Sequence, residues 1–389
     1  MLRNNNAVQW QVVNDMYDST MESLLDEHAP RRKIILRKVP GCPWFDGTCA
    51  SSKKQTRRLE RQFRNSPSEE RECRWRTQVK AQRKLFQQKR SNYLRDSIEG
   101  AQGNGRTLWK SLNTLLTPPQ DTSPRISPDT LLNYFENKID MIRESTKDAP
   151  MPDLSTVPPP AHSLCKFDEI TTAEVEKLIS DSSTKQCELD SAPVWLIKSL
   201  YTVFAPILAL LINISITQAS LPAKHKRAII RPCVKKSGLD PTDPASYRPI
   251  SNLSFISKLV ERVTHKQLSD YVESNHLLPP TQSGFRRHHS TETAVIKVYN
   301  DIILALDSGF ITVLLLLDFS AAFDYVDHTL LLKTMQVQFG ITASAIQWIA
   351  SFLSSRSYSI KLGGCSSKIF TVLFGVPQGS ILGPLLFIL

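Results

Sequence analysis

The spacing of apolar and polar residues predicts helices through most of the first half of the chain. Ser127 and Pro128 are residue types favoured at the cap and in the first turn of a helix. Apolar residues then recur every three or four positions, which places them on one helical face that is expected to pack against a core. These residues are Leu131, Leu132, Phe135, Ile139 and Ile142.

The second half of the chain alternates predicted strands with predicted helices. Residues 228–234 have strand character, and residues 358–362 and 368–374 flank a glycine-rich turn, which predicts a β-hairpin. Asp327 is positioned to cap the helix that follows it. The apolar stretch at 203–216 is too short to span a bilayer and contains a proline and an asparagine, so it predicts a buried helix.

An apolar run at residues 311–317 is followed directly by a carboxylate, Asp318. The run has the length and the Leu, Ile and Val content of a strand that is buried on both faces. A hard oxygen ligand at the end of such a strand is a suitable support for a catalytic metal ion. The alternative is that Asp318 only ends the strand and caps the next helix.

The net charge of +11 comes from one segment. Residues 51–110 contain seventeen Lys or Arg against six Asp or Glu, and the remainder has 31 of each sign. Single aromatic residues interrupt this basic, helix-forming segment, which favours binding to nucleic acid through phosphates and stacked bases. A solvated helical hairpin that packs on another domain is the alternative. The candidate contacts are Arg57, Arg58, Arg61, Arg64, Lys80, Arg83, Lys84, Lys89 and Arg90.

Shifts in composition divide the chain into five parts. We expect a poorly defined segment at 1–50, a basic helical linker region at 51–147, a proline-rich linker at 148–163, a helical region at 164–240 and a further domain at 241–389. The first thirty residues lack the apolar region of a secretory signal, and seven scattered cysteines favour a reducing compartment. Cytoplasm and nucleus are both compatible with this pattern, and no membrane association is expected.

Four motifs of the second half resemble, in order and spacing, those of the reverse transcriptases of non-LTR (LINE-type) retrotransposons. They are ASYRPISNLS at 245–254, QSGFRRHHST at 282–291, LLLLDFSAAFDYVDH at 314–328 and GVPQGSILGPLLF at 375–387. Upstream, residues 185–200, the PWFDGTC segment at 43–49 and the basic segment resemble the same family more loosely. The resemblance implies an α+β fold, namely the fingers and partial palm of a right-hand polymerase after a mostly helical basic region. It also implies an RNA-directed DNA polymerase that uses an RNA template, a DNA primer, deoxynucleoside triphosphates and Mg²⁺.

The resemblance also assigns roles to individual residues. Asp318 matches the first metal-binding aspartate, and the backbone carbonyl of Phe319 would add an oxygen ligand. Phe323 matches the ring that excludes a 2′-hydroxyl, although a core aromatic is the alternative. Asp324 and Asp327 are instead expected to be caps. Nucleotide contacts fall on Arg248, Arg286, Gln378 and Gly379, with Arg287 as a further contact to the template.

The chain departs from this family in one respect that bears on activity. The family carries two adjacent aspartates on a β-hairpin that should follow residue 389, and no Asp-Asp pair occurs in the sequence. We therefore expect an incomplete metal site, an inactive chain, and a partly unburied apolar segment at 381–389. A nucleic-acid-binding protein without catalysis is the competing hypothesis. An unrelated phosphotransfer enzyme is disfavoured because position 320 is a serine, where such enzymes commonly need an acid.

Overall fold

The computed structural model describes residues 2–30, 42–101, 105, 108, 109, 112, 126–154, 160–236, 238–319 and 322–389. The chain forms two compact units. Unit 1 comprises Met1–Arg31 and Pro124–Leu389, and unit 2 comprises Arg32–Ser123. The five-part division expected from composition stays a prediction, and most of the proline-rich linker lies outside the described residues.

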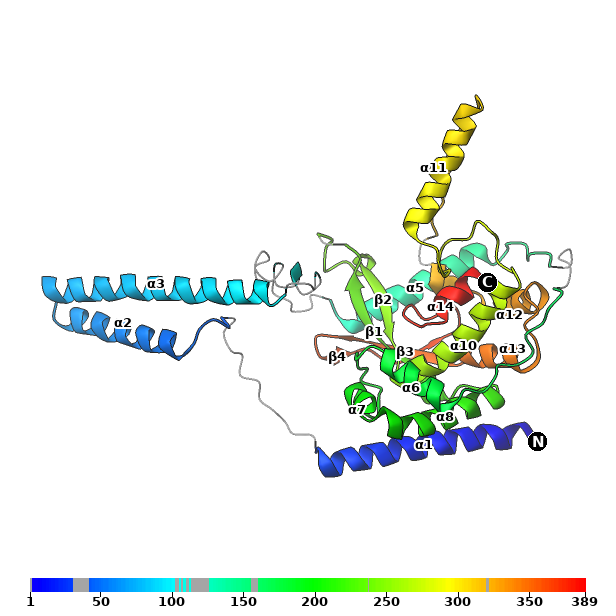
Figure 1. The fold of residues 1–389 in the computed structure, drawn as a ribbon, viewed down its shortest axis with the longest axis horizontal. Helices are drawn as coiled ribbons and strands as arrows, with labels where there is room; N and C mark the ends of the chain where they lie inside the picture. Colours follow the sequence, from blue (N-terminus) through cyan, green and yellow to red (C-terminus); the bar gives the residue numbers. More distant parts are fainter. Residues whose placement is uncertain are drawn as a thin grey trace. The chain divides into compact units, whose positions relative to one another are not determined.

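Unit 2 is a helical hairpin of α2 (Gly47–Asn65) and α3 (Glu69–Glu99), drawn in light blue in Figure 1. Ser68 caps α3 by accepting a hydrogen bond from the backbone N–H of Arg71. The seam between the helices is aromatic, because Phe63 of α2 stacks on Trp75 of α3 with ring centroids 5.7 Å apart. The basic residues therefore remain on the outside of the hairpin.

The helices of unit 1 enclose one large apolar core. It is formed by α1 (Leu2–His28), α6 (Thr172–Asp181), α7 (Val194–Ser199), α8 (Tyr201–Thr217), α10 (Phe255–Ser274), α12 (His328–Val337), α13 (Ala343–Leu353) and α14 (Gly383–Ile388). The apolar stretch at 203–216 lies in α8, where Leu208, Leu211 and Ile212 are fully buried, so the predicted buried helix is confirmed. None of the helices in the described part of the chain has the length and apolar character that crossing a membrane requires.

Both terminal segments contribute side chains to the large core. Helix α1 extends well beyond its expected amphipathic stretch and buries Trp10, whose indole Nε1 donates to the carbonyl of Ser220. At the other end, the segment at 381–389 is partly unburied, as expected, because Ile381, Phe387, Ile388 and Leu389 are only half-buried. Leu382, Leu385 and Leu386 are at most 3% exposed, because α14 inserts into the large core.

Five strands form a mixed sheet. They are β1 (Arg227–Val234), β2 (Tyr247–Asn252), β3 (Arg356–Leu362), β4 (Cys365–Ser366) and β5 (Phe370–Val372). Strand β1 pairs antiparallel with β2 and parallel with β3, while β4 and β5 pair antiparallel with β3. The predicted strand at 228–234 and the predicted hairpin are confirmed. Helices and a sheet of this kind also confirm the α+β class.

Helix α5 (Pro128–Thr146) covers the sheet through a second, smaller core. Ser127 caps it by accepting from the N–H of Thr130, as the sequence predicts. Leu131, Leu132 and Phe135 pack against Ala228, Ile230, Tyr358 and Ile360 of β1 and β3. The apolar face of α5 therefore fixes this helix beside the strands.

The predicted buried strand at 311–317 is wrong in this structure. These seven residues have no regular secondary structure, and their six apolar side chains are between 57% and 93% exposed. A strand requires a neighbour for its backbone N–H and C=O groups, and the described strands pair among themselves without this run. The preceding α11 (Thr291–Asp307) likewise has no buried residue and projects from the rest of unit 1 (Figure 1).

Candidate functional site

Unit 1 contains a cavity of about 560 Å³ where α5, the sheet and two loops meet. This volume lies within the range of small-molecule sites. Five residues singled out from the sequence line it together, namely Arg248, Asp318, Phe319, Phe323 and Gln378. They come from three segments that are far apart in the sequence.

Backbone contacts join two of these segments, the turn η2 (Ala322–Tyr325) and the loop at 375–380. The N–H of Gly375 donates to the carbonyl of Val326, and the N–H of Val376 donates to the carbonyl of Phe323, both at 2.8 Å. Gly375 has a φ of +82°, and a Cβ there would lie 2.7 Å from the Asp324 carbonyl oxygen. Only glycine fits this approach, so the loop can lie directly on the turn.

The ring of Phe323 is held from two sides. It stacks on Phe387 of α14 at 4.8 Å and meets the edge of Phe285 at 5.9 Å. The ring is half-buried against the large core and also lines the cavity. The two interpretations of Phe323, a core aromatic and a wall of a binding site, are thus compatible.

Gln378 and Gly379 dock the loop on β2. The carbonyl of Gln378 accepts from the N–H of Ser251 at 2.7 Å. A Cβ on Gly379, which has a φ of +123°, would lie 2.5 Å from the Ser251 carbonyl oxygen. The close approach to β2 therefore explains why residue 379 is a glycine. The contact of Gly379 with a nucleotide stays a prediction.

The role predicted for Asp324 from the sequence differs from the role that the structure gives it. The expected cap is wrong, because the cap of α12 is Asp327, whereas Asp324 lines the cavity beside Lys138 of α5. Burial raises the pKa of Asp324 from 3.8 to about 6, and the positive charge of Lys138 opposes this rise. The carboxyl therefore titrates close to neutral pH, as groups in functional sites often do.

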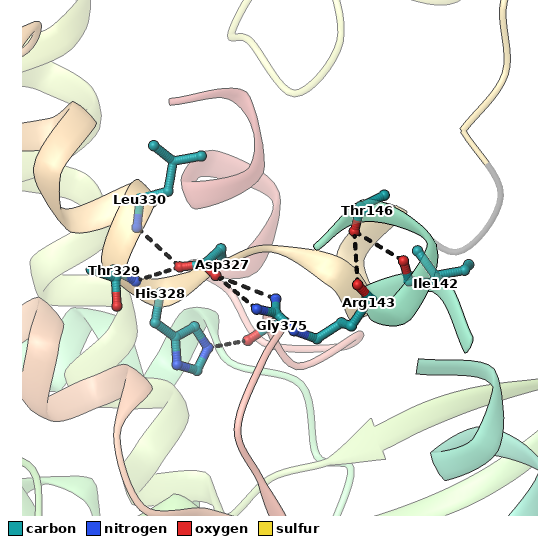
Figure 2. A network of polar contacts seen from close by, with 8 residues as sticks. All are labelled: Ile142, Arg143, Thr146, Asp327, His328, Thr329, Leu330 and Gly375. Atoms are coloured by element: carbon teal, nitrogen blue, oxygen red, sulfur yellow. Dashed lines mark hydrogen bonds and ion pairs between the residues drawn. The ribbon is translucent and has the colours of Figure 1, made fainter. Parts of the chain in front are cut away.

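Asp327 connects the cap of α12 to α5, as Figure 2 shows. Its Oδ1 accepts from the N–H groups of Thr329 and Leu330, which confirms the predicted cap. Its Oδ2 accepts from Arg143 at 3.2 Å, and the Arg143 guanidinium lies 3.4 Å from the centre of the Phe374 ring. Next to it, His328 Nε2 lies 2.7 Å from the carbonyl oxygen of Gly375. This network holds α5, α12 and the loop at 375–380 together.

Arg286 and Arg287 do not line the cavity in this structure. Arg286 forms a bidentate pair with Glu273, with Nε–Oε1 and Nη2–Oε2 distances of 2.9 and 2.7 Å. This pair lowers the pKa of Glu273. Arg287 donates to Asp270 at 3.0 Å. Both arginines thus have partners within the protein, and their nucleotide and template contacts stay predictions.

The basic residues proposed for nucleic acid lie on α2 and α3. All are exposed except Lys89, which is half-buried and pairs with Asp46 at 2.7 Å. Arg64 pairs with Glu60 one turn away. The stretch of α3 from Cys73 to Arg95 contains eight Lys or Arg and no acidic residue. The outer surface of the hairpin is accordingly a region of strong positive charge.

Several cavity-lining residues had no signal of their own in the sequence. Lys138 and Tyr134 belong to the predicted helix after Ser127, but nothing in that segment places the helix beside the later motifs. Arg356 begins β3 and also lines the cavity. Their role depends on tertiary packing, which residue spacing does not encode.

Comparisons with known proteins agree with the motifs. Residues 234–389 match the family model described as reverse transcriptase (RNA-dependent DNA polymerase). The chain is 27% identical to the probable RNA-directed DNA polymerase from transposon BS of Drosophila melanogaster. The alignment spans 349 residues, which is 86% of this chain and 38% of the relative. It is 26% identical to the polymerase from mobile element jockey of Drosophila funebris over 78% of the chain and 35% of the relative. A third relative, from the transposon X-element, is 36% identical over 47% of the chain and 20% of the relative. The chain thus spans well under half the length of these relatives.

Proposed function

Since the chain carries a reverse transcriptase domain of the non-LTR retrotransposon type, we propose that its cavity binds the incoming deoxynucleotide of an RNA-directed DNA polymerase. The observation that carries the proposal is the meeting of Asp318, Phe323, Arg248 and Gln378 in one cavity. In this proposal unit 1 forms the fingers and part of the palm around an RNA template and a DNA primer.

Each residue of the cavity then has a role that follows from its chemistry. Arg248 would donate its planar pair of N–H groups to phosphate oxygens. The immobilised ring of Phe323 would leave no room for a 2′-hydroxyl, which favours deoxynucleotides. The side-chain amide of Gln378 can both donate and accept hydrogen bonds to the nucleotide. Arg286 would have to leave Glu273 to reach a phosphate.

A magnesium ion fits this site on the chemistry of its donors. The described residues contain no cluster of three or more His, Cys, Asp or Glu that would hold a metal ion alone. Magnesium is commonly bound by one or two carboxylates together with substrate phosphates and water. Asp318, with the Phe319 carbonyl, would hold the ion, and Asp324 lines the same cavity. When bound, the ion would activate the primer hydroxyl and neutralise charge on the triphosphate.

The test is primer extension on an RNA template, using protein from the complete reading frame that contains these 389 residues. We expect Asp318→Asn to abolish extension, because the substitution removes a charged metal ligand and preserves the shape of the side chain. Asp301→Asn is the matched control, since Asp301 is an exposed residue of α11 that pairs with Lys297. Extension that survives Asp318→Asn would contradict the assignment. The 389-residue chain alone, which has no adjacent aspartates, is expected to give no extension.

The charge of unit 2 favours a second candidate function, binding of nucleic acid without catalysis. Lys80, Arg83 and Lys84 lie on one exposed side of α3, at spacings of three and four residues. Aromatic residues of the hairpin offer stacking surfaces, although Phe63 and Trp75 already stack on each other. The hairpin could also provide the polymerase with affinity for its template.

Salt dependence of binding to single-stranded RNA tests this second function. With roughly five to eight phosphate contacts, the slope of log affinity against log salt should be about −4 to −6. Replacement of Lys80, Arg83 and Lys84 with Gln should reduce its magnitude by about 2. The control is Gln at Arg71, Arg74 and Arg76, which removes the same charge from arginines that already have partners within the hairpin. A flat salt response, or equal effects of the two sets, would exclude the proposed face.

A further inference from the structure

Arg356 is a buried cation at the wall of the cavity. It is 2% exposed, begins β3 and lines the cavity. Its Nη1 donates to the carbonyl of Phe352 at 2.8 Å, and the guanidinium lies over the Phe352 ring at 4.6 Å. These contacts fix the orientation of the group, as a preorganised donor requires.

The other terminal nitrogen of Arg356 has no acceptor. Nη2 is buried and finds no hydrogen-bond partner within the described part of the chain. A buried donor of a charged group that lacks an acceptor is strongly unfavourable. Arg356 lines the cavity, so a ligand bound there would supply the missing acceptor.

The buried carboxylate of Glu261 supplies charge to Arg356 but no hydrogen bond. Its Oε2 accepts from the N–H groups of Ile381 and Leu382, and its Oε1 accepts from the hydroxyl of Ser257. Among the described residues, no ion pair within 4 Å joins it to Arg356. The oxygens of Glu261 are instead occupied by Ser257 of α10 and by the backbone just before α14.

A second buried cation adds to the positive charge. Lys226 is 8% exposed, and burial together with the charge of Arg356 lowers its pKa to about 8. The cavity itself is lined by four basic residues, Lys138, Lys235, Arg248 and Arg356, against two acidic ones, Asp318 and Asp324. This surplus of positive charge favours an anion over a neutral ligand.

Gln378 offers a second buried polar atom at the cavity without a partner among the described residues. This atom is its side-chain Oε1. An amide at such a position can present either its oxygen or its nitrogen. A nucleoside phosphate offers both an oxyanion and hydroxyl or base groups, which match these two orphan sites.

We propose that Arg356 binds a phosphate oxygen of the nucleotide or nucleic acid that enters the cavity, through its free Nη2. The inference rests on the proposed function for the identity of this substrate. Arg356 would be a phosphate-binding residue in addition to those that the motifs indicated.

Calorimetric titration of the 389-residue chain with pyrophosphate tests this role without polymerisation. Arg356→Met keeps the apolar stem and removes the charge, and we expect it to weaken binding roughly tenfold to a hundredfold, the range for charge-assisted hydrogen bonds. Arg356→Lys should restore part of the affinity. Arg227→Met is the matched control, because Arg227 is exposed on the neighbouring strand, pairs in register with Ser357 and does not line the cavity. Unchanged pyrophosphate affinity in a folded Arg356→Met protein would overturn the proposal.

A measurement on the unaltered protein covers the case in which the variants do not fold. Because Arg356 is buried, we expect its guanidinium protons to exchange slowly, which lets NMR follow them in protein labelled with ¹⁵N-arginine. We expect this protected signal to shift when pyrophosphate is added, and no shift at saturating pyrophosphate would overturn the proposal. Competition then identifies the source of the phosphate: displacement by dATP supports a free nucleotide, and displacement by a single-stranded oligonucleotide supports a backbone phosphate.

The two proposals fail separately. Pyrophosphate binding by Arg356 without primer extension by the complete protein would contradict only the polymerase. Primer extension without any effect of Arg356→Met on pyrophosphate binding would contradict only the role of Arg356.

Discussion

At the scale of single residues, the surroundings of Asp324 and Asp327 decide whether the pKa of each carboxyl is raised or lowered. Asp327 accepts two backbone N–H groups and an arginine, so its charge is stabilised and its pKa is lowered. Asp324, three residues earlier, is half-buried at the cavity, and this burial raises its pKa to about 6. Two aspartates of one motif therefore differ in ionisation because their surroundings differ.

The raised pKa of Asp324 predicts a dependence of stability on pH. The folded state retains a proton that the unfolded state releases above 3.8, so stability falls as pH rises from about 4 to about 6 and stays low above it. Asp324→Asn removes the ionisable group and should raise the free energy of unfolding at pH 7 by up to about 3 kcal/mol, with no gain near pH 3.5.

Urea unfolding at pH 3.5 and pH 7 measures this difference. Asp301→Asn is a suitable control, because Asp301 is exposed on α11, where it pairs with Lys297. An equal change at both pH values would show that Asp324→Asn acts through packing instead of ionisation.

At the scale of elements, the cavity exists because specific contacts hold two loops and one helix against each other. Gly375 lets the loop at 375–380 approach the turn η2, and Arg143 links α5 to Asp327. The pair between Arg143 and Asp327 is about one-third exposed, so its contribution to stability is small and its contribution to positioning is larger.

Alanine substitutions at Gly364 and Gly375 separate the cost of the steric contact at residue 375 from the cost of a left-handed backbone conformation. Gly364→Ala in the β3–β4 turn, with a φ of +87° and no atom within 4 Å of the new Cβ, should cost only about 1 kcal/mol of left-handed strain. Gly375→Ala has a similar φ but places its Cβ 2.7 Å from a carbonyl oxygen, so we expect a loss of roughly 3 kcal/mol or more. Chemical denaturation of both proteins tests the difference. Equal losses would mean that the loop does not need to lie on the turn.

At the scale of the whole molecule, the most unusual feature is an apolar surface at α11 and residues 311–317. Large exposed apolar patches mark interaction sites or promote aggregation. Tyr299, Leu304 and Leu306 are each more than half exposed, and Leu315 and Leu316 are 77% and 81% exposed. The 389-residue chain should therefore bind hydrophobic dyes and self-associate.

Replacement of Leu315 and Leu316 with Ser should reduce this self-association in analytical ultracentrifugation. The free energy of unfolding should change little, within about 0.5 kcal/mol, because both side chains are exposed. Leu385→Ser is the contrasting variant, since Leu385 is 3% exposed in the large core and its loss should destabilise the fold. A large loss of stability with Leu315 and Leu316 replaced would indicate that the run is buried in solution.

Local patterns in the sequence determined several helix caps, a buried helix and a hairpin of this protein. The caps at Ser127 and Asp327, the buried helix at 203–216 and the hairpin around the turn at 363–364 follow from neighbouring residues, because caps, periodicity and turns are local interactions. The motifs themselves predicted the match of residues 234–389 to the reverse transcriptase family model. Only the tertiary structure decided that 311–317 is unpaired, that Asp324 and Lys138 share a cavity, and that Arg356 is buried without an acceptor. Strand pairing, burial and the meeting of distant side chains are long-range interactions, so residue spacing cannot specify them.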